Sequence, residues 1–197
     1  MNKYIGLLIF CIHLTLIPAS AQNINDQWKI LNKNAMALEK SGEYGLAILT
    51  NKQAILIARK TCQSTNKTHC SNELRTSLSH LASTYKAQGN YAETIPIYEE
   101  MLKIWEEAVP SNPDAVTMKN LADAYRTQGR HPEAELIYLK SLKSIINASK
   151  TQPPGSFYDG LVISIYRGLS ASYWVTERES EAEAMDRQAN RIKSKEN

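Results

Sequence analysis

The strongest constraint on the fold of this chain is a repeat within its own sequence at an offset of 40 residues. Residues 81–102 align with residues 121–142 without a gap, and nine of the 22 aligned positions are identical. The identical residues are, in order, Leu, Ala, Tyr, Gln, Gly, Glu, Ile, Tyr and Leu. Such a repeat predicts a small helical unit that stacks on copies of itself, because one unit alone cannot bury its apolar face.

Each copy predicts two helices joined by a turn. The first helix carries an apolar stripe at the i, i+3, i+4 and i+7 positions of one helical face: Leu78, Leu81, Ala82 and Tyr85. Gly89 and Gly129 follow this helix in the two copies, where glycine can adopt the left-handed conformation that ends a helix. In Asn112-Pro113-Asp114 we predict the start of the next helix, with Asn112 as its cap.

Two weaker copies flank this pair, so the sequence predicts an all-α solenoid of about four antiparallel helix pairs, or eight helices. We place the pairs at about residues 25–62, 72–108, 113–149 and 156–194. Glu177 stands in the last copy where the others have glycine, and we expect that turn to differ in shape. The final helix has a narrow apolar stripe with charge around it, as suits a terminal cap.

The N-terminus has the pattern of a secretory signal peptide. Lys3 precedes an apolar stretch at 5–17, and Pro18 is followed by the small residues Ala19-Ser20-Ala21. An apolar stretch of this length is short for a membrane-spanning helix, which needs roughly 20 residues. We therefore expect residues 1–21 to be removed and 22–197 to form the mature domain, in a bacterial periplasm or secreted. We expect no membrane span in the mature chain.

Composition and charge exclude some classes of function. Hydrophobic residues make up 43% of the chain and charged residues 22%, which is typical of globular proteins. The formal net charge is +3 and no run of Lys and Arg occurs, so nucleic acid is not an expected partner. Cys62 and Cys70 flank a short polar segment, and in an oxidising compartment they favour a disulfide. A metal site at these cysteines and His69 would lack a fourth ligand.

The repeated residues resemble the tetratricopeptide repeat (TPR). The shared pattern is Leu-Ala-x-x-Tyr, then Gly four residues after the tyrosine, then Tyr or His, Glu and a later Tyr. Residues 112–138 are especially similar to the longer repeat, about 40 residues, of kinesin light chains. HEAT or armadillo repeats have suitable lengths but lack this placement of Gly and Tyr, and they are the alternative fold. The resemblance implies a scaffold that binds a partner and has neither cofactor nor catalytic site.

The resemblance also implies a binding surface, because such domains usually hold a peptide on the concave face made by the first helix of each pair. The corresponding residues are Ser79, His80, Ser83, Lys86, Lys119, Asn120, Asp123, Arg126, Arg167 and Trp174. From the residues alone, positions 119, 123 and 126 share one helical face, with either a binding role or plain solvation as its explanation. The cations among them would favour an acidic segment or a C-terminal carboxylate of the partner.

Three functions are compatible with these features. The first is an exported adaptor or assembly factor of the cell envelope that holds a peptide segment of another protein. The second is a structural solenoid that associates with copies of itself. The third is a hydrolase centred on His80, with Ser79 and Ser83 as neighbours, although the sequence supplies no third orienting group for such a site.

Overall fold

The computed structural model describes residues 24–64, 67–109, 114–149 and 156–194. These residues form eight α-helices and one short 3₁₀ helix, with no strand among them. The chain divides into two compact units, Met1–Gly89 and Asn90–Asn197. The fold is thus all-α, as the sequence predicts. No helix in the described part of the chain is both long enough and apolar enough to cross a membrane.

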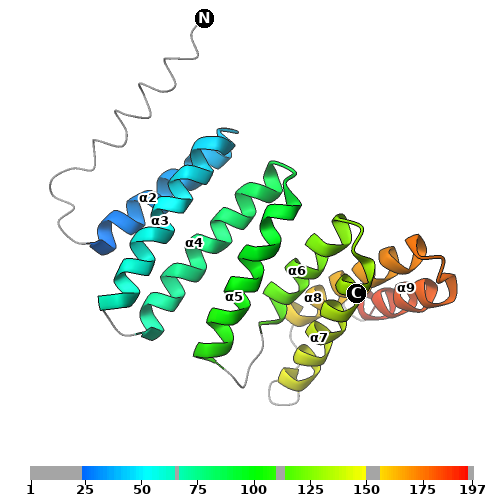
Figure 1. Cartoon of the computed structure of the whole chain (residues 1–197). Coiled ribbons are helices and arrows are strands. Elements are labelled where there is room, and N and C mark those ends of the chain that lie inside the picture. The colour runs from blue at the N-terminus through cyan, green and yellow to red at the C-terminus, as the bar shows by residue number, and fades with distance from the viewer. Residues whose placement is uncertain (1–23, 65–66, 110–113, 150–155, 195–197) are drawn as a thin grey trace, which may run out of the picture. The chain divides into compact units, whose positions relative to one another are not determined.

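The first unit contains three helices (Figure 1), α2 (Ile24–Lys40), α3 (Tyr44–Ser64) and α4 (Lys67–Ala87). Helix α3 packs against both α2 and α4, and α2 also touches α4. The packed positions of α2 and α3 are filled by alanines with no exposed surface, namely Ala35, Ala47, Ala54 and Ala58. Small side chains let the helix axes approach closely, and the first helices of two successive pairs come into contact as a result.

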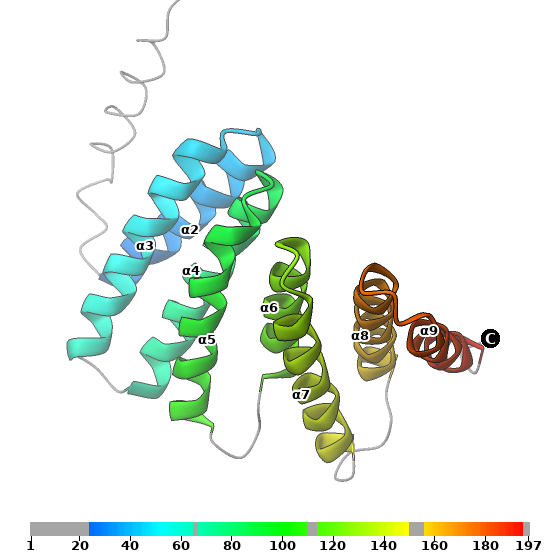
Figure 2. The same ribbon diagram turned by 45° about the vertical axis from the view of Figure 1, so that its right-hand side comes forward.

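The second unit contains the remaining helices (Figure 2), η1 (Tyr91–Glu93), α5 (Thr94–Ala108), α6 (Ala115–Thr127), α7 (His131–Ser149), α8 (Ser156–Val175) and α9 (Glu179–Lys193). Helices α6 and α7 form one pair, α8 and α9 form the next, and α6 also touches α8. The side chains of Tyr138, Ile165 and Leu169 are fully buried among these helices. The apolar stripes predicted from the repeat are the packed faces.

Helix α6 begins two positions later than predicted. Asp114 is its cap: Asp114 Oδ1 accepts a 3.0 Å hydrogen bond from the Thr117 N–H, and Oδ2 accepts one of 2.7 Å from Thr117 Oγ1. The cap is thus Asp114 and not the predicted Asn112, which lies outside the described residues. An aspartate cap three residues before the donor satisfies an N–H group that has no partner within the helix.

The turns between paired helices share one geometry. Gly129 has φ +73°, its N–H donates to Arg126 O at 3.0 Å, and the Arg130 N–H donates to Tyr125 O at 2.9 Å. This pair of bonds closes the helix end around a left-handed residue. We expected the turn at Glu177 to differ, and it does not: Glu177 has φ +58° and the Arg178 N–H donates to Tyr173 O at 2.9 Å.

Candidate functional site

The candidate face of the second unit begins on α6, where the predicted cation Lys119 is already paired. Lys119 Nζ lies 2.7 Å from Asp123 Oδ2, and the Tyr138 hydroxyl of α7 donates to Asp123 Oδ1. Tyr138 has no exposed surface, and burial raises the pKa of its hydroxyl, with the charge of Asp123 adding to the shift. The positive charge of Lys119 is thus compensated within the fold.

Arg126 and Asn120 are half-buried on the same helix. The Arg126 guanidinium forms a hydrogen bond that opposes the rise in the pKa of Tyr138, while its Nε is buried without a hydrogen-bond partner among the described residues. Lys119, Asp123, Arg126 and Tyr138 therefore form one polar cluster at the junction of α6 and α7. The side chains of this cluster pair with one another between the two helices, so they hold α6 against α7 and do not form an open cationic surface.

Helix α8 presents the more accessible part of this face. Arg167 and Trp174 are exposed and Ala171 is half-exposed. Their spacing of i, i+4 and i+7 puts the three residues on one side of the helix. Gly168, next to Arg167, is buried, and a Cβ atom added there would overlap the Tyr138 ring. The close approach of α8 to Tyr138 therefore requires glycine at this position.

The candidate residues of the first unit lie on α4, and two of them bond to α2. His80 Nδ1 lies 3.0 Å from Asn32 Oδ1, and Ser83 Oγ donates to Glu39 Oε1 at 2.9 Å. Burial lowers the pKa of His80, while the charge of Glu39 acts in the opposite direction.

The other α4 candidates differ in exposure: Ser79 is exposed and Lys86 is half-buried. Asn32, on α2, is 6% exposed and also accepts a 3.3 Å hydrogen bond from Ser77 Oγ. The polar residues between α2 and α4 therefore hold neighbouring first helices together. Among the predicted cations, Lys86 belongs to the first unit, whereas Lys119, Arg126 and Arg167 belong to the second, so a shared role of the four in binding stays a prediction.

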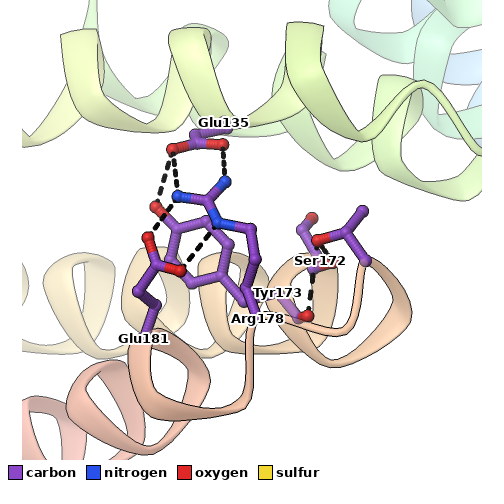
Figure 3. Close-up of polar contacts among 6 residues, drawn as sticks. Glu135, Ser172, Tyr173, Arg178 and Glu181 are labelled. Carbon is purple, nitrogen blue, oxygen red and sulfur yellow. Dashed lines mark hydrogen bonds and ion pairs between the residues drawn. The ribbon is translucent and has the colours of Figure 1, made fainter.

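A second polar cluster, which the sequence analysis missed, joins three helices of the second unit (Figure 3). Arg178, in the turn before α9, contacts Glu135 of α7 with Nη1–Oε2 at 2.6 Å and also pairs with Glu181 of α9. Its guanidinium carbon lies 4.1 Å from the centre of the Tyr173 ring, and the Tyr173 hydroxyl donates to Glu135 Oε1 at 2.9 Å. We name Glu135, Tyr173, Arg178 and Glu181 the turn cluster.

The charges of the turn cluster shift its pKa values in the directions expected for ion pairs. The hydrogen bond from Arg178 holds the pKa of Glu135 below its ordinary value, and it does the same for Glu181. Burial raises the pKa of Tyr173 to about 12, and its hydrogen bond to Glu135 adds to the rise.

The preceding pair has a similar arrangement. Arg130 lies 4.3 Å from the centre of the Tyr125 ring and pairs with Glu133 at 2.9 Å, while the Tyr125 hydroxyl donates to Glu99. The spacing Tyr-x₄-Arg-x₂-Glu occurs in the sequence at both turns, at 125–133 and 173–181, and it is the signal that could have revealed the cluster.

Two sequence predictions concern chemistry outside this face. The Cys70 side chain lies outside the described residues, so a disulfide with the half-buried Cys62 stays a prediction, as does the signal peptide at 1–21. Within the described ranges, no group of three or more His, Cys, Asp or Glu side chains is placed to hold a metal ion.

Comparisons with known proteins agree with the repeat architecture. The tetratricopeptide repeat family model matches residues 73–145. The crystal structure of BtubC (BKLC) from P. vanneervenii is 18% identical with a TM-score of 0.72, over 90% of this chain and 67% of that one. A protein from Podosopora anserina, described as a kinesin light chain with nearly identical TPR-like repeats, is 20% identical with a TM-score of 0.65, over 95% and 83%. A search of the curated proteins finds no match.

Proposed function

We propose that this chain holds an extended segment of a partner protein, because residues 73–145 match the tetratricopeptide repeat family, whose fold is a protein–protein interaction scaffold. The segment lies on the exposed side of α8 that carries Arg167, Ala171 and Trp174, which we name the α8 face. The polar cluster of Lys119, Asp123, Arg126 and Tyr138 supports this face from α6 and α7. The observation that carries this proposal is that one side of α8 exposes both a large aromatic, Trp174, and a cation, Arg167, that has no ion pair among the described residues.

The chemistry of the α8 face indicates what it binds. Trp174 is 47% exposed, although tryptophan contributes most when its large surface is buried. Arginine and tryptophan are also the residues that most often dominate the energy of protein interfaces. The planar guanidinium of Arg167 fits a carboxylate through two parallel hydrogen bonds. The partner therefore offers an acidic side chain or a C-terminal carboxylate to Arg167 and an apolar side chain to Trp174.

The spacing of Arg167 and Trp174 constrains the bound segment further. Seven residues of an α-helix span about 10 Å, at roughly 1.5 Å per residue. An extended peptide covers the same distance in about three residues, at roughly 3.3 Å each. The recognised element is thus a carboxylate and an apolar side chain about three residues apart, with the small Ala171 leaving room for the peptide between them.

Lys119 and Arg126 support the α8 face instead of contacting the partner first. Lys119 is held by Asp123, and Arg126 packs at Tyr138, so replacing either with glutamate would place a carboxylate beside Asp123 and disturb the packing of α6 on α7. Variants of these two residues would therefore confuse loss of binding with loss of structure.

The compartment is a second part of the proposal. The pattern at 1–21 and the pair Cys62 and Cys70 are those of an exported protein, so the chain acts as an adaptor or assembly factor of a bacterial cell envelope. In a secreting bacterial host, N-terminal sequencing of the exported protein should start at Gln22. Recovery of the full-length chain in the cytoplasm would contradict export.

The binding test is affinity capture from an envelope extract with the immobilised 22–197 domain. The wild type is compared with Arg167→Glu/Trp174→Ala and with Arg191→Glu, which reverses one exposed charge on α9. We expect a partner that is retained by the wild type and the α9 variant and lost from the double variant. Equal retention by all three proteins would place the site elsewhere, and a folded domain that retains nothing specific would refute the scaffold.

A further inference from the structure

The outer side of α7 is a second exposed surface with a distinct chemistry. Leu136, Leu139 and Ile146 are 54%, 46% and 55% exposed, while the opposite side of the helix is buried in the unit. With Lys143, these side chains occupy i, i+3, i+7 and i+10, which is the spacing of the contact seam of a coiled coil. We name Leu136, Leu139, Lys140, Lys143 and Ile146 the α7 seam.

The charge on the α7 seam has one sign. Lys140 and Lys143 are exposed, and neither forms an ion pair within the described part of the chain. No acidic residue lies between Leu136 and Ile146. Large apolar side chains in contact with water are expected to be covered by a partner when they gather on one face, and the lysines require that partner to carry negative charge.

The second helix of the first pair carries the same combination. On α3, Leu49 and Leu56 are 48% and 64% exposed, and the exposed Lys52 lies between them. Helices α3 and α7 belong to different copies of the repeat and have different neighbours. The exposed leucines and lysines are therefore a feature of two second helices and not of α7 alone.

We propose that the α7 seam binds an acidic amphipathic helix of a partner protein. The seam offers knobs at heptad spacing over nearly three turns, and a helix with apolar residues along one stripe packs its own side chains between them. Glutamates or aspartates that flank this stripe lie beside Lys140 and Lys143. This surface is distinct from the α8 face, so the protein can hold two segments at once.

An anionic membrane and a second copy of the chain fit the α7 seam less well. On α5, the exposed residues at the positions 40 earlier are Pro96, Glu99, Lys103 and Glu106, and their carboxylates would be repelled by an anionic lipid surface. Two α7 seams placed against one another would bring lysines of like charge together. A single acidic helix lies along α7 alone, and its carboxylates face Lys140 and Lys143.

The test uses a designed two-heptad peptide with leucine at the seam positions, glutamate at the flanking positions and a fluorescent label. Binding to the 22–197 domain is followed by anisotropy at low and at physiological ionic strength. The controls are the same peptide with lysine in place of glutamate, Leu139→Asp and Lys140→Glu/Lys143→Glu on the seam, and Val116→Asp at an exposed apolar position of α6. Circular dichroism confirms that each variant is folded.

We expect the acidic peptide to bind, with at least a tenfold loss of affinity in both seam variants and less than a twofold change in Val116→Asp. The basic peptide should bind at least tenfold more weakly. Absence of binding by the acidic peptide, or equal affinity for wild type and Leu139→Asp, overturns the proposal. Seam-dependent binding to phosphatidylglycerol vesicles without peptide binding, or seam-dependent dimerisation in sedimentation, would replace it with a lipid surface or a second copy.

Discussion

Replacing Gly168 with alanine should show how helix propensity and side-chain packing each contribute to the stability of α8. The added Cβ would overlap Cζ and the hydroxyl oxygen of Tyr138 and lie 2.9 Å from Cε1. Tyr138 cannot retreat easily, because it has no exposed surface and its hydroxyl donates to Asp123. Gly160 is the matched control, since it lies on the same helix and a Cβ there meets no atom within 4 Å.

The two opposing effects have known sizes. An alanine in place of glycine within a helix stabilises the folded state by about 1 kcal/mol. Forcing extra volume into a packed site costs about 1–3 kcal/mol. Gly160→Ala should therefore gain about 1 kcal/mol of unfolding free energy, whereas Gly168→Ala should lose up to about 2 kcal/mol, as the sum of these two terms.

Urea unfolding followed by circular dichroism measures both variants, with equal slopes required for comparison. The packing argument predicts that Gly168→Ala is less stable than Gly160→Ala by about 1–3 kcal/mol. Equal stabilisation by the two substitutions would falsify the close approach of α8 to Tyr138.

Three further predictions follow from the turns and the cysteines. Because Arg178 holds the pKa of Glu135 below its ordinary value of 4.5, the pair stabilises the fold above that pH, and the effect is lost as pH falls through the folded-state pKa. Glu135→Gln should lower the melting temperature at neutral pH and flatten its fall in acid. Glu177→Gly should change the unfolding free energy by less than about 1 kcal/mol, because relief of the left-handed strain is offset by greater freedom of the unfolded chain. Thiol titration of the denatured, unreduced mature chain should find no free thiol at Cys62 or Cys70, and two free thiols would contradict the disulfide.

The helix pairs could be predicted from the sequence because they depend on spacing along the chain. The stripe at Leu121, Ala122 and Tyr125 repeats the one 40 residues earlier, and a period of 3.6 residues identifies the packed face without knowledge of any neighbour. The tetratricopeptide repeat family model matches the same region, at residues 73–145.

The candidate site could be predicted only in part, because its charges depend on contacts between helices. Lys119 and Asp123 are four residues apart, so their ion pair was accessible from helical spacing alone. The contact of Glu135 with Arg178 spans 43 residues, and only the packing of α7 on α8 brings the two together. The turn at Glu177 was mispredicted for the same reason. Glutamate by itself disfavours the left-handed conformation, but the contacts of the neighbouring Arg178 in the turn cluster hold this turn in place.

The position of the turn cluster determines how the last helix pair would come apart under load. Among the described helices, α9 packs on α8. The ion pair between Arg178 and Glu135 links this helix pair to α7 at the turn that joins α8 and α9. The far end of α9, near Lys193, has no such fastening in the described contacts. Pulled from its C-terminus, the chain should peel from Lys193 toward the turn, and amide hydrogens along α9 should exchange in that order.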